Sequence, residues 1–201
     1  MRGFAARLGA SKMYRRNLPH WYPDGTAVFV TWRLYGTLPQ SADRILDGRG
    51  FRDADRQLDR AASGPSWLSE ACVAGCAAGA LRRAAMERQL CLLHAFVVMP
   101  NHVHVLLTPR EELPRVTRWI KGVSARRTNQ LLGGTGRPFW QDESFDHWVR
   151  DHWEFSRIRR YIEQNPVQAG LVQSPEQWPY SSASAQAESL CHGSGVEVPE
   201  M

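Results

Sequence analysis

The stretch LCLLHAFVVMPNHVHVLL at residues 90–107 decides the fold of this chain. Its first half, from Leu90 to Met99, is an apolar run typical of a strand. Pro100-Asn101 is a turn signal, and His102 to Leu107 is a second strand-like run. Strands joined by so short a turn pair antiparallel. The stretch therefore predicts a β-hairpin.

Two histidines in the second strand are separated by one apolar residue. Side chains alternate along a strand, so His102 and His104 share one face, with α-carbons about 7 Å apart. Val103 then points to the other side, into the core. Both imidazoles can bind one metal ion in this arrangement. The alternative is two ordinary histidines on a solvated sheet face.

Further elements are expected on both sides of this hairpin. Prolines and aromatic residues favour an extended arm at residues 14–23, and β-branched and aromatic residues favour a strand from Val28 to Tyr35. Short strands or extended segments are expected at 137–141 and 144–149. Helices are expected at about 44–62, 68–87 and 114–132.

Another helix is marked by the capping-box spacing of Asp151 and Glu154. We expect it to end at Asn165, because Pro166 disfavours helical geometry in the preceding residue. Tyr161 and Asn165 are four residues apart, so their side chains stack on adjacent turns about 6 Å apart. The alternatives without a catalytic role are that Tyr161 is an amphipathic core residue and that Asn165 caps the end of the helix.

Strand and helix together suggest one chemical site. His102 and His104 offer neutral nitrogen ligands, and Asn165 offers an amide oxygen. Mixed ligation with open positions for water and a phosphate oxygen suits Mg²⁺ or Mn²⁺ acting as a Lewis acid. Tyr161, one turn from Asn165, is placed to attack the polarised phosphorus.

The net charge of +5 suits a polyanionic partner. An arginine-rich composition explains the same charge without any function, so placement matters more than number. Basic residues and neighbouring aromatics can contact a DNA backbone and stack on bases, or they can solvate helices and fold back on the sheet. The candidate DNA-binding residues are Arg15, Arg16, Trp21, Tyr22, Arg115, Arg118, Arg126, Arg127, Arg157 and Arg160.

The chain has 201 residues, enough for one sizeable core. We expect a flexible basic N-terminus at 1–13, one domain at 14–183 and a flexible tail at 184–201. No run of about 18 apolar residues and no signal-peptide core occurs, and the four cysteines lack zinc-site spacing. These features predict a soluble cytoplasmic protein with free thiols and no membrane partner.

Two longer motifs carry a family resemblance. Residues 96–107, FVVMPNHVHVLL, resemble the histidine-hydrophobic-histidine (HUH) motif of single-tyrosine insertion-sequence transposases. Residues 161–172, YIEQNPVQAGLV, resemble the tyrosine helix of their domesticated relatives, the REP-associated tyrosine transposases. WIKG at 119–122 and FWQDESFD at 139–146 are further matches. The resemblance extends from about Leu18 to Ala183.

The resemblance implies a ferredoxin-like α+β fold, with an antiparallel sheet and helices packed on it. It also implies a divalent cation on His102 and His104 and a 5′-phosphotyrosine link formed by Tyr161. The implied partner is a single DNA strand bearing a hairpin, as in repetitive extragenic palindromes (REPs), acted on by a monomer or homodimer. Insertion-sequence members often have glutamine where Asn165 stands, so this shorter side chain can bind less directly or through water.

Two other functions fit the same residues. One is a catalytically silent protein that binds hairpin nucleic acid. The other is a plain metal-dependent hydrolase in which Tyr161 is structural and the histidines activate water. A covalent protein–DNA adduct distinguishes both from the transposase-like enzyme.

Overall fold

A four-stranded antiparallel sheet forms the centre of the computed structural model, which describes residues 12–15, 19–23, 25–37, 55–59 and 64–184. Its strands are β3 (Val28–Arg33), β4 (Cys91–Val98), β5 (His102–Pro109) and β6 (Phe145–Trp148), in the spatial order β4-β5-β3-β6. With a helix after β3 and another after β5, the chain order is the βαββαβ pattern of ferredoxin-like folds. The predicted α+β class and the predicted central hairpin are therefore confirmed.

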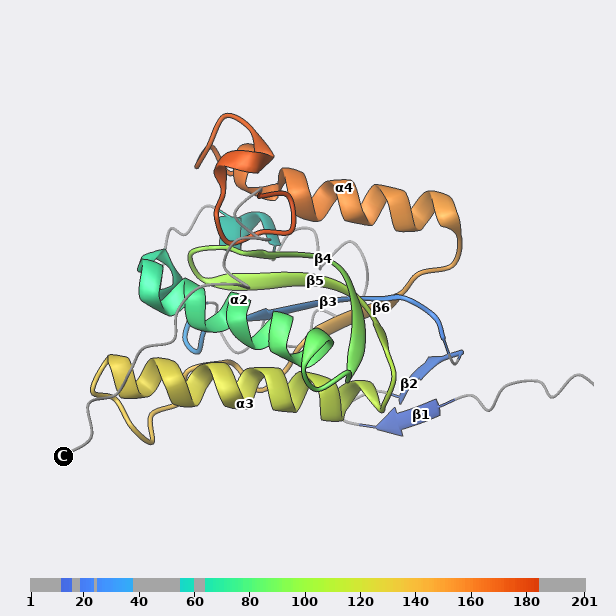
Figure 1. Cartoon of the computed structure of the whole chain (residues 1–201), viewed down its shortest axis with the longest axis horizontal. Helices are drawn as coiled ribbons and strands as arrows, with labels where there is room; N and C mark the ends of the chain where they lie inside the picture. The colour runs from blue at the N-terminus through green and yellow to red at the C-terminus, as the bar shows by residue number, and fades with distance from the viewer. Residues whose placement is uncertain (1–11, 16–18, 24, 38–54, 60–63, 185–201) are drawn as a thin grey trace, which may run out of the picture.

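Helices α2 (Ala71–Met86) and α3 (Leu113–Leu131) cover one face of this sheet (Figure 1). Strand alternation explains which side chains they cover. Val103, Val105 and Leu107 point toward these helices and join a core that includes Trp32 and Ile120. This core holds the larger share of the buried apolar side chains of the described residues.

Helix α4 (His152–Gln168) covers the opposite face (Figure 1). It packs through Ile158 and Ile162 against Phe29, Val97 and Leu106 in a second, smaller apolar cluster. Leu106 lies two and four residues beyond the histidines of β5, so His102 and His104 share this face. The sheet thus separates a structural face from a face that carries the candidate site.

Strands β1 (Lys12–Arg15) and β2 (Pro19–Tyr22) form a separate two-stranded sheet. The extended arm expected at 14–23 corresponds to this pair. Lys12 and Met13 were assigned to a flexible N-terminus, but they pair with Tyr22 and Trp21. Ser184, the first residue of the predicted flexible tail, is buried. Residues 1–11 and 185–201, which hold the rest of the two predicted ends, lie outside the described residues.

Two helix predictions need correction or limitation. The helix expected at 68–87 begins with a separate 3₁₀ turn, η2 (Trp67–Ser69), and α2 then continues past Gly75 and Gly79. Of the helix expected at 44–62, the structure describes 55–59, which is helical. Of the short strand or extended segment expected at 137–141, the structure forms no strand: Trp140 makes one isolated bridge to Leu34.

Helix α4 does not end at Asn165 as predicted, because Pro166 lies inside it. A proline in the last turn costs one intrahelical hydrogen bond. Asn165 and Pro166 are both buried, and their carbonyls accept hydrogen bonds from the Ala169 and Leu171 amides at 2.9 Å. Burial and these bonds hold the turn in place. Another 3₁₀ turn follows, η3 (Pro175–Gln177).

No helix among the residues described combines the length and apolar character needed to cross a bilayer.

Candidate metal centre and tyrosine helix

The two histidines of β5 direct the same ring nitrogen toward one point. His102 Nε2 lies 3.0 Å from His104 Nε2, and both residues are fully buried. Metal–nitrogen bonds of about 2.1 Å place two adjacent ligands of one ion about 3 Å apart. The nitrogen pair therefore has the spacing of two ligands on one ion.

Each histidine is oriented through its other nitrogen. Asn101 Nδ2 donates to the Leu58 carbonyl at 2.9 Å, which leaves its Oδ1 to accept from His102 Nδ1 at 2.7 Å. Thr31 Oγ1 lies 2.7 Å from His104 Nδ1. A hydrogen bond at Nδ1 fixes the ring and favours a lone pair on Nε2, as in histidines that bind metals.

Two carboxylates from the helical segment 55–59 meet the histidines. Asp55 Oδ1 lies 3.2 Å from His104 Nε2, and Asp59 Oδ1 lies 3.6 Å from His102 Nε2. Asp55 is 4% exposed. The ligand atoms of Asp55, His102 and His104 all lie within 4.8 Å of one another, so this group can hold a metal ion.

Burial and charge control the protonation of this cluster. Burial, and the nearby His104, lower the pKa of His102 to about 3, so its ring is neutral at neutral pH. Burial and repulsion by Asp55 raise the pKa of Asp59 to about 6. Burial also favours the neutral form of Asp55, but attraction to His104 and a hydrogen bond with that ring outweigh it and lower the pKa of Asp55. Neutral imidazole beside carboxylate is a donor set suited to a divalent cation.

The ring of Tyr161 lies against the group that can hold a metal ion. Its centroid is 5.5 Å from that of His104 and 6.1 Å from that of Phe29. Phe29 also stacks on His104, with centroids 5.6 Å apart. The aromatic contacts hold the tyrosine of α4 beside a histidine of β5.

Asn165, one turn after Tyr161, is fully buried. Its amide lies near the Asp59 carboxylate and partly offsets the rise in the pKa of Asp59. Neither its Oδ1 nor its Nδ2 has a hydrogen-bond partner within the described part of the chain. A buried polar atom without a partner is costly, so this amide is positioned for a group that binds in the cluster.

The candidate DNA-binding arginines lie on different surfaces. Arg157 and Arg160 are exposed on α4, the helix that carries Tyr161, and Arg157 pairs with Glu154 at 3.2 Å. Arg115 pairs with Glu111 at 2.7 Å on α3, across the sheet from α4. The other exposed arginines predicted on α3 are Arg118, Arg126 and Arg127.

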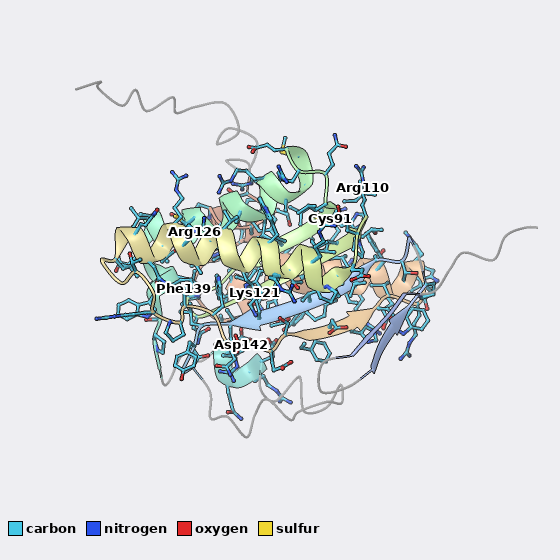
Figure 2. The ribbon with its side chains drawn as sticks, turned by 90° about the horizontal axis from the view of Figure 1, so that it is seen from below. Cys91, Arg110, Lys121, Arg126, Phe139 and Asp142 are labelled. Carbon is cyan, nitrogen blue, oxygen red and sulfur yellow. The ribbon has the colours of Figure 1, made fainter. Side chains whose placement is uncertain are left out.

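Figure 2 views the molecule from the α3 side, with Arg126 on that helix and Lys121 close to Asp142. Lys121 Nζ donates to the carbonyls of Gln141 and Asp142 at 2.6 and 2.9 Å. This lysine therefore holds a loop against α3. The α3 surface and Tyr161 lie on opposite sides of the sheet.

The arm residues are placed in part. Arg15 lies in β1, and Trp21 and Tyr22 lie in β2. Arg16 lies outside the described residues. The structure thus brings His102, His104, Tyr161 and Asn165 to one face and leaves the arm as a separate pair of strands.

Sequence reasoning missed Asp55 and Asp59. Their four-residue spacing places both on one side of a helix, and that is the signal that could have found them. This spacing is common on solvent-exposed helices, and it does not indicate which residues the two carboxylates contact. Only the docking of segment 55–59 onto β5 distinguishes this pair from surface charge.

Comparison with known proteins was consistent with the sequence resemblance. Residues 77–165 match the model of the family described as "Transposase IS200 like". A Haemophilus influenzae protein described as a REP-associated tyrosine transposase is 29% identical over 100 residues, covering 44% of this chain and 56% of that protein. The REP-associated tyrosine transposase of Escherichia coli K12 is 30% identical over 94 residues, covering 45% and 53%. The chain spans about half the length of these relatives.

One similar solved structure is that of a REP-associated tyrosine transposase bound to a REP hairpin. It superposes with a TM-score of 0.55 over 84% of this chain and 81% of that chain, at 22% identity. At this identity the match shows a shared fold. The chain is therefore similar to the IS200-like transposases over residues 77–165, and to two REP-associated tyrosine transposases over just under half of its length.

Proposed function

We propose that this protein is a metal-dependent endonuclease and strand transferase that acts on single-stranded DNA carrying a hairpin, through a 5′-phosphotyrosine on Tyr161. The observation that carries the proposal is the packing of the Tyr161 ring against the His104 ring, with ring centroids 5.5 Å apart. It sets a nucleophilic side chain beside a group that can hold a metal. The hairpin substrate is supported by the REP hairpin bound in the similar structure.

The proposed site contains His102 and His104 as nitrogen ligands, with Asn165 as an oxygen ligand. A Mg²⁺ or Mn²⁺ ion held there supplies Lewis acidity to the scissile phosphate. The buried amide of Asn165, which has no hydrogen-bond partner among the described residues, supports its assignment as a ligand.

Tyr161 then attacks phosphorus with its phenolate oxygen. The new O–P bond forms as the P–O3′ bond breaks, and the 3′ oxygen leaves as a hydroxyl after taking up a proton. The phosphotyrosine conserves the energy of the broken bond, so a free 3′-hydroxyl can reverse the step and join strands without ATP. Arg157 and Arg160, exposed on the same helix, are suited to contact the DNA backbone.

The cellular setting is part of the same proposal. We assign the protein to the cytoplasm, acting as a monomer or homodimer. Cys72, Cys76 and Cys91 are free thiols, which suits a reducing compartment.

An adduct assay tests the function. End-labelled hairpin oligonucleotide is mixed with protein and Mn²⁺, and a covalent complex is sought on a denaturing gel. We expect the adduct with wild-type protein and with Tyr35→Phe, which changes a half-exposed tyrosine elsewhere. We expect none with Tyr161→Phe.

Other outcomes identify the alternatives. Adduct formation by Tyr161→Phe contradicts the nucleophile. Hairpin binding without any adduct, in Mg²⁺ or Mn²⁺, supports the catalytically silent binding protein. Cleavage without a covalent intermediate, undiminished in Tyr161→Phe, supports a plain hydrolase.

A further inference from the structure

Segment 55–59 presents two carboxylates to the histidines of β5. Asp55 and Asp59 are one helical turn apart, so both face the same way. Each lies beside a different imidazole, at 3.2 Å from His104 Nε2 and 3.6 Å from His102 Nε2. The Asp55 side chain is 5% exposed and that of Asp59 is 19% exposed. The pair belongs to the buried cluster and not to the solvated surface.

The charge of this cluster is unbalanced. Buried carboxylates are normally paired with cationic groups or bound to metals, because an isolated ion loses its hydration. Among the residues that the structure describes, no lysine or arginine forms an ion pair with Asp55 or Asp59. The Nδ1 atoms of both histidines are engaged by Asn101 and Thr31. One divalent cation would neutralise both carboxylates.

A second, independent observation points to a ligand in the same place. The Asn165 amide is fully buried beside Asp59, and both of its polar atoms lack a hydrogen-bond partner within the described residues. A carboxylate can only accept hydrogen bonds, so its natural partner is the Asn165 Nδ2 group. That orientation leaves Asn165 Oδ1 to face a cation.

We infer that Asp55 is a further protein ligand of the divalent cation, beside His102, His104 and Asn165, and that Asp59 orients Asn165 toward it. The inference rests on the proposed metal-dependent function and extends its ligand set. Two imidazoles and one carboxylate with open positions form a known binding pattern for divalent transition metals. Asp55 is thus a metal ligand, and Asp59 is a positioning residue.

Binding of Mn²⁺ to the full chain tests this without DNA or turnover. Isothermal titration calorimetry and the loss of the free Mn²⁺ signal in electron paramagnetic resonance measure affinity. We expect one site in wild-type protein, an affinity loss of about 100-fold in Asp55→Asn, and about 10-fold in Asp59→Asn. Asp142→Asn removes the same charge at an exposed residue and should bind like wild type.

Thermal unfolding shows whether each variant is folded and gives a second measure of Mn²⁺ binding. Because Asp55→Asn removes a buried negative charge that repels Asp59, the metal-free variant should stay folded and melt close to the wild-type temperature. The rise in melting temperature that Mn²⁺ gives to wild type should be absent from it. A merely structural Asp55 would instead lower the metal-free melting temperature and leave the rise intact, which would overturn the inference.

The same titration with His102→Ala separates the two proposals. If His102→Ala loses Mn²⁺ while Asp55→Asn binds within twofold of wild type, the inference fails and the proposed metal site stands. If wild-type protein binds neither Mn²⁺ nor Mg²⁺, the metal-dependent function fails together with the inference. Loss of binding in both variants, with Asp142→Asn unaffected, supports both.

Discussion

Thr31 and His104 are direct partners in the β3–β5 register, and Thr31 Oγ1 lies 2.7 Å from His104 Nδ1. Strand β5 places His104 on the site face, and Thr31 of the neighbouring strand β3 fixes the orientation of its ring. Both groups are buried, so the hydrogen bond is shielded from water. Substitution of the threonine should affect the metal site without touching a ligand.

Thr31→Val keeps the shape of the side chain and removes its hydroxyl. We expect Mn²⁺ affinity to fall about 10–100-fold, because outer hydrogen bonds hold ligand histidines in orientation. Calorimetric titration measures the change, and Thr31→Ser, which keeps the hydroxyl, should bind close to wild type. Equal affinities for Thr31→Val and wild type would contradict the orienting role.

Asn101 links His102 to the carbonyl of Leu58. Asn101→Ala leaves both groups buried without this partner, at a cost of about 1–3 kcal/mol each. Urea unfolding should show a large loss of stability. Asn129→Ala, which removes an exposed bond to the Arg137 carbonyl, should cost far less, and similar losses in both variants would count against the linking role of Asn101.

Ile162 anchors α4 to the sheet and is fully buried in the second apolar cluster. Ile162→Ala should lower the free energy of unfolding by about 2–5 kcal/mol through lost burial and a residual cavity. Trp153→Ala is the matched control on the same helix, because Trp153 is 82% exposed. Comparable losses in the two variants would show that α4 is not anchored through Ile162.

Glu154 contributes stability that depends on pH. Burial favours its neutral form, but hydrogen bonds from the Arg150 amide and His147 outweigh this, so the pKa is lowered from 4.5. A lowered carboxyl pKa adds stability above pH 4.5 that disappears as pH falls through the folded-state pKa. Glu154→Gln should therefore be less stable than wild type at pH 7, and the difference should shrink below pH 4.5. A constant difference would contradict this.

The sheet separates two arginine surfaces, and the two should behave differently. Arg157→Ala with Arg160→Ala should weaken binding of single-stranded DNA and reduce the slope of log affinity against log salt by about 1.4, for two lost phosphate contacts. It should also slow adduct formation at saturating DNA, because these residues flank Tyr161. The α3 substitutions Arg126→Ala and Arg127→Ala should weaken DNA binding and leave the rate of adduct formation at saturating DNA unchanged. Slower adduct formation in these variants would contradict the different roles of the two surfaces.

Local sequence predicted much of this molecule. Alternation along residues 102–107 placed His102 and His104 on one face, and the Asp151–Glu154 spacing marked the start of α4, where Asp151 Oδ1 accepts from the Glu154 amide at 2.7 Å. These features depend only on residues one helical turn apart or two positions apart along a strand. They can therefore be derived from the spacing of residues in the sequence. The family resemblance of the two motifs added the ferredoxin-like fold.

Tertiary structure decided the rest. Asp55 reaches His104 across 49 residues of chain, and no local period encodes that approach. The course of α4 through Pro166 likewise depends on the burial of Asn165 and Pro166, which outweighs the local preference of proline. The placement of the α3 arginines across the sheet from Tyr161 follows from topology. Sequence determined which side chains share a face, whereas long-range packing decided which faces meet.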